Sequence, residues 1–380
     1  MKRELFSQEH EIFRDAFRKF LEKEVIPHRE EWEKQGMVSR EVWKKAGEAG
    51  FLLPWIPEEY GGMGADFLYS VVIIEELAYA MESGFAIALH NDVVAPYIYY
   101  FGNEEQKKRW LPPAARGEKI FAVAMTEPDA GSDLQRIKTT AIRDGDYYIL
   151  NGTKMFITNG LLADVVVVAA KTNPDADPPY TGVSLLVVER GMEGFKRGRK
   201  IPKMGMWAQD TAELIFEDVK VPVENLLGEE GAGFYYLMKE LQQERLVVAI
   251  GAVAAAEKAF EITKQYLNER HAFGRPLKKF QYIRFKMAEL ATEIALGREF
   301  VDRLIREHMK GEDVVVETSM AKWWTTEMLK RVVDWGVQFH GGYGYTLEYP
   351  ISKAFLDARV QTIYAGTTEI MKEIISRRIL

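Results

Sequence analysis

The feature that most constrains the fold is a change of periodicity in the middle third of the chain. Residues 140–221 contain short runs rich in Val, Ile, Leu and Phe, and no long helical pattern separates these runs. Parallel strands need a crossover connection between them, usually a helix. Because the crossovers are missing, we expect the middle of the chain to form an antiparallel β-domain rather than a parallel nucleotide-binding sheet.

Turn signals predict how these strands connect. Asn151-Gly152 stands between the runs 147–150 and 155–158, and such a dipeptide is a strong signal for a two-residue hairpin. Further strands are expected at 165–168, 183–188 and, as a strand pair, 214–216 and 219–221.

Helical periodicity flanks the β-region on both sides. In the first third, Ser7, Ser39 and Asp66 stand where a side-chain oxygen can cap the first turn of a helix. Longer helical patterns follow the β-region at 234–269, 281–310, 314–338 and 369–378. Long helices with short connections are typical of an antiparallel bundle.

The expected fold class is therefore α+β, with three consecutive domains. These are an N-terminal helical domain (1–120), a middle antiparallel β-domain (121–229) and a C-terminal four-helix bundle (230–380). No G-x-G-x-x-G motif opens a helix after a strand, so the common dinucleotide fingerprint is missing.

Composition excludes several classes of protein. The chain has no cysteine, which rules out disulfides and thiolate chemistry, and its six histidines show no paired spacing for zinc. A net charge of -7 argues against non-specific nucleic-acid binding. The longest apolar run, 246–256, is too short to span a membrane, and from the charged residues at the start of the sequence we expect no signal peptide. We expect no metal, and a cytoplasmic protein or a mature mitochondrial matrix form.

The basic stretch 196–200 is expected to be a solvated loop or strand edge, with a docking patch for an anionic substrate or redox partner as the alternative.

Three motifs carry a resemblance to a known family. They are Ala124-Met-Thr-Glu-Pro-Asp-Ala-Gly-Ser-Asp133, Gln243-Glu-Arg-Leu246 and Ile363-Tyr-Ala-Gly-Thr-Thr-Glu-Ile370. With them the chain resembles the acyl-CoA dehydrogenase family over essentially its whole length. The resemblance implies an FAD-dependent α,β-dehydrogenation of an acyl-CoA thioester to trans-2-enoyl-CoA. It also implies that electrons pass to an electron-transfer flavoprotein.

The position of the catalytic base is unusual in this chain. Many members of the family carry a glutamate where this chain has Ala365. A minority, including the long-chain and isovaleryl types, carry it on an earlier helix, where this chain has Glu244. We therefore expect Glu244 to remove the α-proton and the backbone N–H of Ala365 to hold the thioester carbonyl as enolate charge develops. A carboxylate needs desolvation, which raises its pKa, to act on a carbon acid.

The resemblance also implies the residues that bind substrate and cofactor. Substrate contacts are expected from Ser132, Tyr235, Arg245 and Gly366. FAD contacts are expected from Met125, Thr126, Ser132, Phe156, Ile157, Thr158, Arg270, Phe273, Gln281, Gln338, Gly341, Gly342, Thr367 and Glu369. Because the family draws Gln281, Gln338 and the two adjacent glycines from a neighbouring subunit, we expect a homotetramer built as a dimer of dimers.

Several alternatives remain open from the sequence. Glu369 is a nearby rival for the base, although the family pattern places it by the FAD. The small residues that follow Glu244 on its helix fit a slot for a long acyl chain or tight helix packing equally well. Arg136 stands where a small residue is usual, so the path of that loop is open. An acyl-CoA oxidase, a flavin monooxygenase and a non-enzymatic scaffold protein are the competing functions.

Overall fold

The computed structural model describes residues 3–380, and its helices and strands follow the order helical, β, helical. The first third contains α1 (Gln8–Phe20), α2 (Arg29–Gln35), α3 (Arg40–Glu48), α4 (Phe67–Tyr79), α5 (Ala95–Phe101) and α6 (Glu104–Ala115). The predicted caps are confirmed: the side chains of Ser39 and Asp66 accept hydrogen bonds from the backbone of α3 and α4, and Ser7 forms a capping box with His10. Local polar capping therefore sets where these helices begin.

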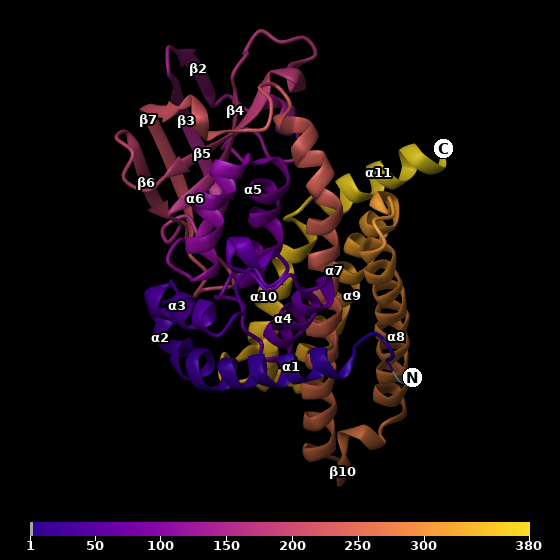
Figure 1. The fold of residues 1–380 in the computed structure, drawn as a ribbon. Helices are drawn as coiled ribbons and strands as arrows, with labels where there is room; N and C mark the ends of the chain where they lie inside the picture. The colour runs from indigo at the N-terminus through magenta and orange to yellow at the C-terminus, as the bar shows by residue number, and fades with distance from the viewer. Residues whose placement is uncertain (1–2) are drawn as a thin grey trace.

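The middle third forms one eight-stranded sheet (Figure 1). Its strands are β1 (Phe121–Ala124), β2 (Thr140–Asp144), β3 (Tyr147–Thr158), β4 (Val165–Lys171), β5 (Val183–Glu189), β6 (Phe195–Lys200), β7 (Thr211–Pro222) and β8 (Leu226–Leu227). The main path runs β6-β7-β3-β2-β4-β5-β8. Most pairs are antiparallel as predicted, but β4 pairs in parallel with β1 and, at one position, with β2.

Two details of the predicted strand order were wrong. Asn151-Gly152 is not a hairpin turn, because β3 continues through it as one strand with a bulge at that point. Gly152 has φ +147°, and a Cβ there would lie 2.4 Å from Thr139 Oγ1, so the bulge needs glycine. The expected strand pair at 214–221 is likewise one strand, β7, whose residue Asp218 has φ +49°.

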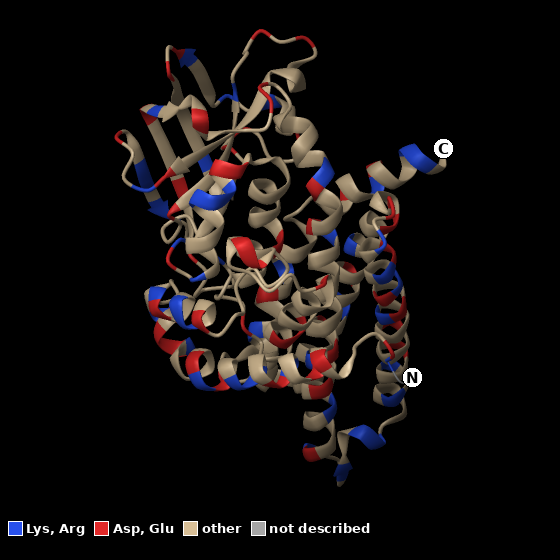
Figure 2. Ribbon diagram, in the orientation of Figure 1, with Lys and Arg blue, Asp and Glu red and all other residues tan. Residues whose placement is uncertain are grey.

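Strands β4 and β5 are buried on both faces, and the alternation along β4 shows how. Val165 and Val167 pack into a core shared with the N-terminal helices, whereas Val166 and Val168 pack into a second core with β3 and β7. This period of two follows from the pleat of a strand. The basic stretch 196–200 lies in β6 at the sheet edge, where Figure 2 shows it in blue, so the predicted strand edge is confirmed.

The last third is helical. It contains α7 (Gly233–Glu269), α8 (Gln281–Met309), α9 (Val315–His340), α10 (Pro350–Ala358) and α11 (Thr368–Ile379). All four predicted long helices are present, and α10 was not predicted. A short hairpin, β9 (His271–Ala272) with β10 (Arg275–Pro276), connects α7 to α8 at the end of α7 remote from the sheet (Figure 1). A third core joins α7, α8, α9 and α10 to α4, so α7 contacts both helical regions. No helix within residues 3–380 is long and apolar enough to cross a membrane.

Candidate active site

Glu244 lies in the first half of α7, inside a strongly apolar part of that helix. Its side chain is buried, and the hydroxyl of Tyr97 donates a hydrogen bond to Oε1 at 2.7 Å. Burial raises the pKa of Glu244 to about 7, although the Tyr97 hydrogen bond and the neighbouring Arg245 lower it. A carboxyl group with this pKa is ionised and basic enough near neutral pH to accept a proton.

An irregular turn immediately precedes the helix that carries Tyr97. The π-helix η4 (Leu89–Val94) precedes α5, and wide turns of this kind are common at functional sites. The backbone carbonyl of Asp92 in η4 accepts a hydrogen bond from Gln243 Nε2 at 2.7 Å. Because Gln243 is adjacent to Glu244, this contact fixes the segment that carries Tyr97 against the base. No pattern in the sequence marks Tyr97 as a partner of the base.

A second buried carboxyl group lies one helical turn before Glu244. Glu240 is 6% exposed, and burial together with repulsion from Glu244 raises its pKa to about 7. Carboxyl groups whose charges repel each other in this way have coupled titrations. The i, i+4 spacing of Glu240 and Glu244 was visible in the sequence but was not recognised there.

The substrate contacts expected on and near α7 differ in exposure. Arg245 is 4% exposed, and its Nη1 donates to Ser319 Oγ at 3.3 Å, so it lies in the interior beside the base. Tyr235, in the first turn of α7, is 66% exposed. Ser132, near the end of the Ala124–Asp133 motif, is also exposed. Arg136, in the segment that follows this motif, is also exposed. Its backbone N–H donates a hydrogen bond to the Asp133 carbonyl at 3.1 Å, which closes a short 3-10 turn.

The Ala365-Gly366 turn has an unusual backbone conformation. Ala365 has φ +50° and Gly366 has φ +92°. Within residues 3–380 the Ala365 N–H donates no hydrogen bond, and Gly366 O accepts one from Lys322 Nζ at 2.6 Å. Thr367 then caps α11 by accepting from the Ile370 N–H at 3.3 Å. The turn therefore offers a backbone donor without an internal partner, as an oxyanion site requires.

Glu369 is a poorer base than Glu244. It is exposed in the first turn of α11, and hydrogen bonds from its own N–H and from Thr367 lower its pKa. Its carboxylate is therefore less basic than an ordinary glutamate, whereas burial makes Glu244 more basic.

The turn expected to pass close to FAD is held by a buried ion pair. Lys154 is fully buried, and its Nζ donates to the carbonyl of Met125 at 2.9 Å and to Glu127 Oε1 at 2.8 Å. The Glu127 carboxylate also accepts from the N–H groups of Lys138 and Thr139, and the Lys154 charge lowers its pKa against the opposing effect of burial. Sequence reasoning missed Lys154, which pre-forms the turn that contains Met125 and Thr126.

The segment Phe156–Thr158 forms the end of β3. Phe156 has φ +61° in the irregular pairing with β7, and its ring is 59% exposed. A strained backbone and an exposed aromatic ring together are typical of a ligand site. Ile157 is buried in the sheet, and Thr158 is half-buried beside it. This arrangement fits a planar aromatic cofactor stacked on Phe156.

A hollow of about 460 Å³ brings together four of the predicted cofactor residues. Its lining includes Arg270, Gln338, Gly341 and Gly342. Arg270 directly follows α7, and the other three residues lie at or just after the end of α9. No atom lies within 4 Å of a Cβ built on either glycine, so the glycines leave the backbone open to a ligand. A guanidinium beside exposed backbone suits a pyrophosphate, and these residues therefore fit FAD. Phe273, which is 94% exposed, and Gln281 lie outside this lining.

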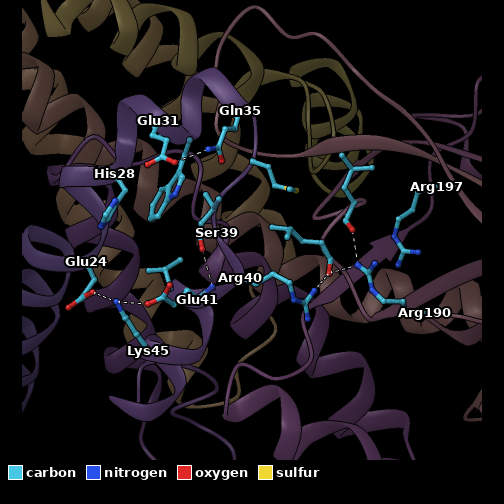
Figure 3. Close-up of a pocket in the computed structure, with 16 residues that line it drawn as sticks. Glu24, His28, Glu31, Gln35, Ser39, Arg40, Glu41, Lys45, Arg190 and Arg197 are labelled. Carbon is cyan, nitrogen blue, oxygen red and sulfur yellow. Dashed lines mark hydrogen bonds and ion pairs between the residues drawn. The ribbon is translucent and has the colours of Figure 1, made fainter.

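A larger hollow of about 720 Å³ lies between α2, α3 and the turn before β4, with Arg190 and Arg197 also in its lining (Figure 3). None of the predicted site residues lines it. Arg40 and Arg190 both bond to Asp164 and to the carbonyl of Leu162, so their guanidinium groups hold the turn before β4. We assign this arginine cluster a structural role. No group of three or more metal-ligating side chains occurs within the part of the chain that the structure describes.

Comparison with known proteins gives matches over the whole chain. Models of the acyl-CoA dehydrogenase N-terminal, middle and C-terminal domains match residues 7–118, 122–219 and 231–380. The chain is 52% identical to the long-chain specific acyl-CoA dehydrogenase, mitochondrial, of Sus scrofa, over 100% of this chain and 88% of the relative. Its structure matches an acyl-CoA dehydrogenase from Geobacillus kaustophilus with a TM-score of 0.98 and 60% identity, covering 100% of both chains. It also matches an acyl-CoA dehydrogenase complexed with FAD from Bacillus anthracis with a TM-score of 0.92 and 36% identity, covering 100% of this chain and 68% of that one. The fold, the buried glutamate and these matches agree that the chain belongs to the acyl-CoA dehydrogenase family of FAD-dependent oxidoreductases.

Proposed function

We propose that this protein oxidises long-chain acyl-CoA thioesters to trans-2-enoyl-CoA with Glu244 as the catalytic base. The observation that carries the proposal is the buried Glu244 carboxyl group, whose pKa is raised to about 7 and which is held by Tyr97. The alternative position of the base in the family is occupied by Ala365, which cannot accept a proton. Among the carboxyl groups of the three motifs within residues 3–380, burial raises the pKa of Glu244, whereas the pKa values of Glu127, Asp129 and Glu369 are lowered.

The residues of the chain divide the work of removing the α-proton. Glu244 takes the proton, and its desolvation makes it basic enough to do so near neutral pH. The free N–H of Ala365 donates to the thioester carbonyl oxygen, which gains negative charge as the proton leaves. Tyr97 keeps Oε1 of Glu244 in one orientation. The Glu244 side chain is buried, which keeps bulk water away from the carboxylate.

FAD, when bound, supplies the acceptor for the hydride that leaves the β-carbon. The residues that would hold its ring system are Met125, Thr126, Phe156 and Thr158, with the turn pre-formed by Lys154. Thr367 and Glu369, at the start of α11, would complete that end of the site.

We infer that the hollow at Arg270 serves the FAD of a neighbouring subunit. Arg270 follows Glu244 by 26 residues along α7 and its last turn, which corresponds to roughly 39 Å at about 1.5 Å per residue. That separation exceeds the length of one FAD molecule. If a partner contributes Arg270, Gln338 and the two adjacent glycines, cofactor binding requires oligomerisation. This supports the homotetramer, with Gln281 at the start of α8 and Phe273 in the hairpin near the same hollow.

Small residues on α7 support the preference for a long acyl chain. Val248, Gly251 and Ala255 form a half-buried stripe after Glu244, and a Cβ on Gly251 would first meet Ile74 Cγ2 at 3.5 Å. An extended alkyl chain can lie along such a stripe, and each buried CH₂ contributes about 0.8 kcal/mol. The identity to a long-chain relative points the same way.

An electron-transfer flavoprotein is the proposed electron acceptor, in keeping with the family. An acyl-CoA oxidase would consume oxygen instead, and a flavin monooxygenase would have no use for a base aimed at a thioester. A scaffold protein would need neither a free Ala365 N–H nor a buried glutamate of raised pKa.

Anaerobic mixing of the FAD-loaded protein with acyl-CoAs of increasing length tests this function. We expect the visible flavin band to bleach, fastest with long chains, and the reduced protein to pass its electrons to an electron-transfer flavoprotein faster than to oxygen. Loss of bleaching with every acyl-CoA would contradict the dehydrogenase assignment. Rapid reoxidation by oxygen alone would favour the oxidase.

A further inference from the structure

Lys322 is a buried lysine with a single recorded partner. It lies in α9 with 0% of its surface exposed, and within residues 3–380 its Nζ hydrogen-bonds only to Gly366 O, at 2.6 Å. Burying an ammonium group without an ion pair is costly, and such groups are retained mainly where they have a function. The bond joins α9 to the turn that is expected to bind the substrate carbonyl.

The turn that Lys322 holds is strained. Ala365 has φ +50°, a left-handed conformation that is unfavourable for a non-glycine residue, and Gly366 follows with φ +92°. Such a conformation persists only when contacts around it determine it. The orientation of the Ala365 N–H depends on both residues, and the Lys322 bond fixes the peptide that follows them.

The same part of α9 also holds the base. Ser319, one turn before Lys322, accepts the hydrogen bond from Arg245 Nη1 at 3.3 Å, and Arg245 follows Glu244 directly. One turn of α9 thus contacts both the helix that carries the base and the turn that carries the oxyanion donor. These two hydrogen bonds therefore connect the segment of the base and the segment of the donor to the same turn of α9.

The charges around Lys322 limit how it can act. Burial and repulsion from Arg245 lower its pKa to about 8, while Glu327 and Glu369 oppose that shift. At neutral pH the ammonium form dominates, and its positive charge favours a developing enolate nearby.

We propose that Lys322 is a positioning residue for α-proton removal. Its bond to Gly366 O orients the Ala365 N–H toward the thioester carbonyl of the same substrate whose α-proton Glu244 removes. The proposal rests on the function proposed above. It assigns Lys322 no contact with substrate or cofactor. Its consequence is that Lys322 affects the proton-removal step rather than the binding of the acyl-CoA.

The test uses the FAD-loaded protein and a 3-thia-acyl-CoA, in which sulfur replaces the β-carbon. This analogue can lose its α-proton but has no β-hydride to give, so exchange of the α-proton in D2O, followed by NMR, reports proton removal alone. We expect Lys322→Met to slow exchange in the bound complex about 10- to 100-fold, since losing or misplacing one oxyanion donor has effects of that order. The Kd of the analogue should change less than about threefold, because most of its binding surface is untouched.

Lys353→Met is the matched control. Lys353 in α10 is also largely buried, and burial likewise lowers its pKa to about 8, but it pairs with Glu33 rather than with the Ala365-Gly366 turn. This variant should exchange the α-proton at the wild-type rate. If Lys322→Met fails to fold, Lys322→Gln carries the same expectation, because its amide is too short to reach Gly366 O.

The outcomes separate this inference from the function on which it rests. Exchange in Lys322→Met or Lys322→Gln within twofold of wild type, or a slower rate explained wholly by weaker binding, overturns the role of Lys322 alone. Absence of exchange in the wild-type protein overturns both proposals. Exchange that survives in Glu244→Gln would remove the base assignment.

Discussion

Replacing Tyr97 by Phe removes the one hydrogen bond that the structure gives the Glu244 carboxylate. The ring remains, so packing is preserved and only the hydroxyl is lost. A hydrogen bond to a charged group contributes about 1.5–3 kcal/mol, and one pKa unit corresponds to about 1.4 kcal/mol. The pKa of Glu244, about 7 in the wild type, should therefore rise by about one to two units.

The sign of the effect on rate follows from the protonation state of Glu244. The base works when deprotonated, so the rate of flavin reduction rises with pH through the pKa of Glu244. At pH 7 the ionised fraction falls from about one half to between roughly a tenth and a hundredth, a loss of about 5- to 50-fold. Above the new pKa the difference should disappear, because the variant is then ionised too.

Anaerobic stopped-flow measurement of flavin reduction from pH 6 to 10 checks this prediction. Tyr99→Phe, two residues along α5 and without a bond to Glu244, serves as the control and should keep the wild-type profile. The reasoning would be refuted if Tyr97→Phe lowered the rate by the same factor at every pH and the pH at which the rate rises did not move.

Three further predictions concern other parts of the molecule. Glu240→Gln removes a negative charge one helical turn before Glu244, so the pH at which the rate of flavin reduction rises should become lower. A shift of that pH to a higher value would contradict the repulsion between the two carboxyl groups. Gly152→Ala places a Cβ 2.4 Å from Thr139 Oγ1, and the urea midpoint should fall by an amount equivalent to about 1–3 kcal/mol. An unchanged midpoint would show that the bulge can move. Arg270→Ala should raise the Kd for FAD about 10- to 100-fold in a titration of apoprotein, and an unchanged Kd would exclude a phosphate contact.

The helices were predictable because their signals are local. Ser39 and Asp66 cap the helices that follow them, and the long helices after residue 230 follow the apolar periodicity. The two expectations that failed concern single residues inside long strands. Asn151 is a residue type typical of hairpin turns. In the structure its side chain donates to Asp218 Oδ1 at 2.9 Å and accepts from the Asp218 backbone N–H at 2.8 Å. A bulge and a turn use the same residue types, and only the partner strand decides between them.

The candidate site was predictable only where a motif contains the residue. Glu244 and Ala365 lie in motifs that the sequence displays. The residues that orient them do not: Tyr97 is 147 positions from Glu244, and Lys322 is 44 positions from Gly366. A single tyrosine or lysine in an apolar helix has no local pattern that distinguishes it from a packing residue. Tertiary structure alone brings these groups together.

The central claim is that Glu244, and no other carboxylate, removes the α-proton. The most direct test measures flavin reduction by a long-chain acyl-CoA in Glu244→Gln in a single anaerobic turnover, with bound FAD measured in the same sample. The account predicts a full complement of flavin and a rate at least about a thousandfold lower than that of the wild type, because the amide cannot accept a proton. Reduction at a near-wild-type rate would contradict the account and would assign the base to another residue.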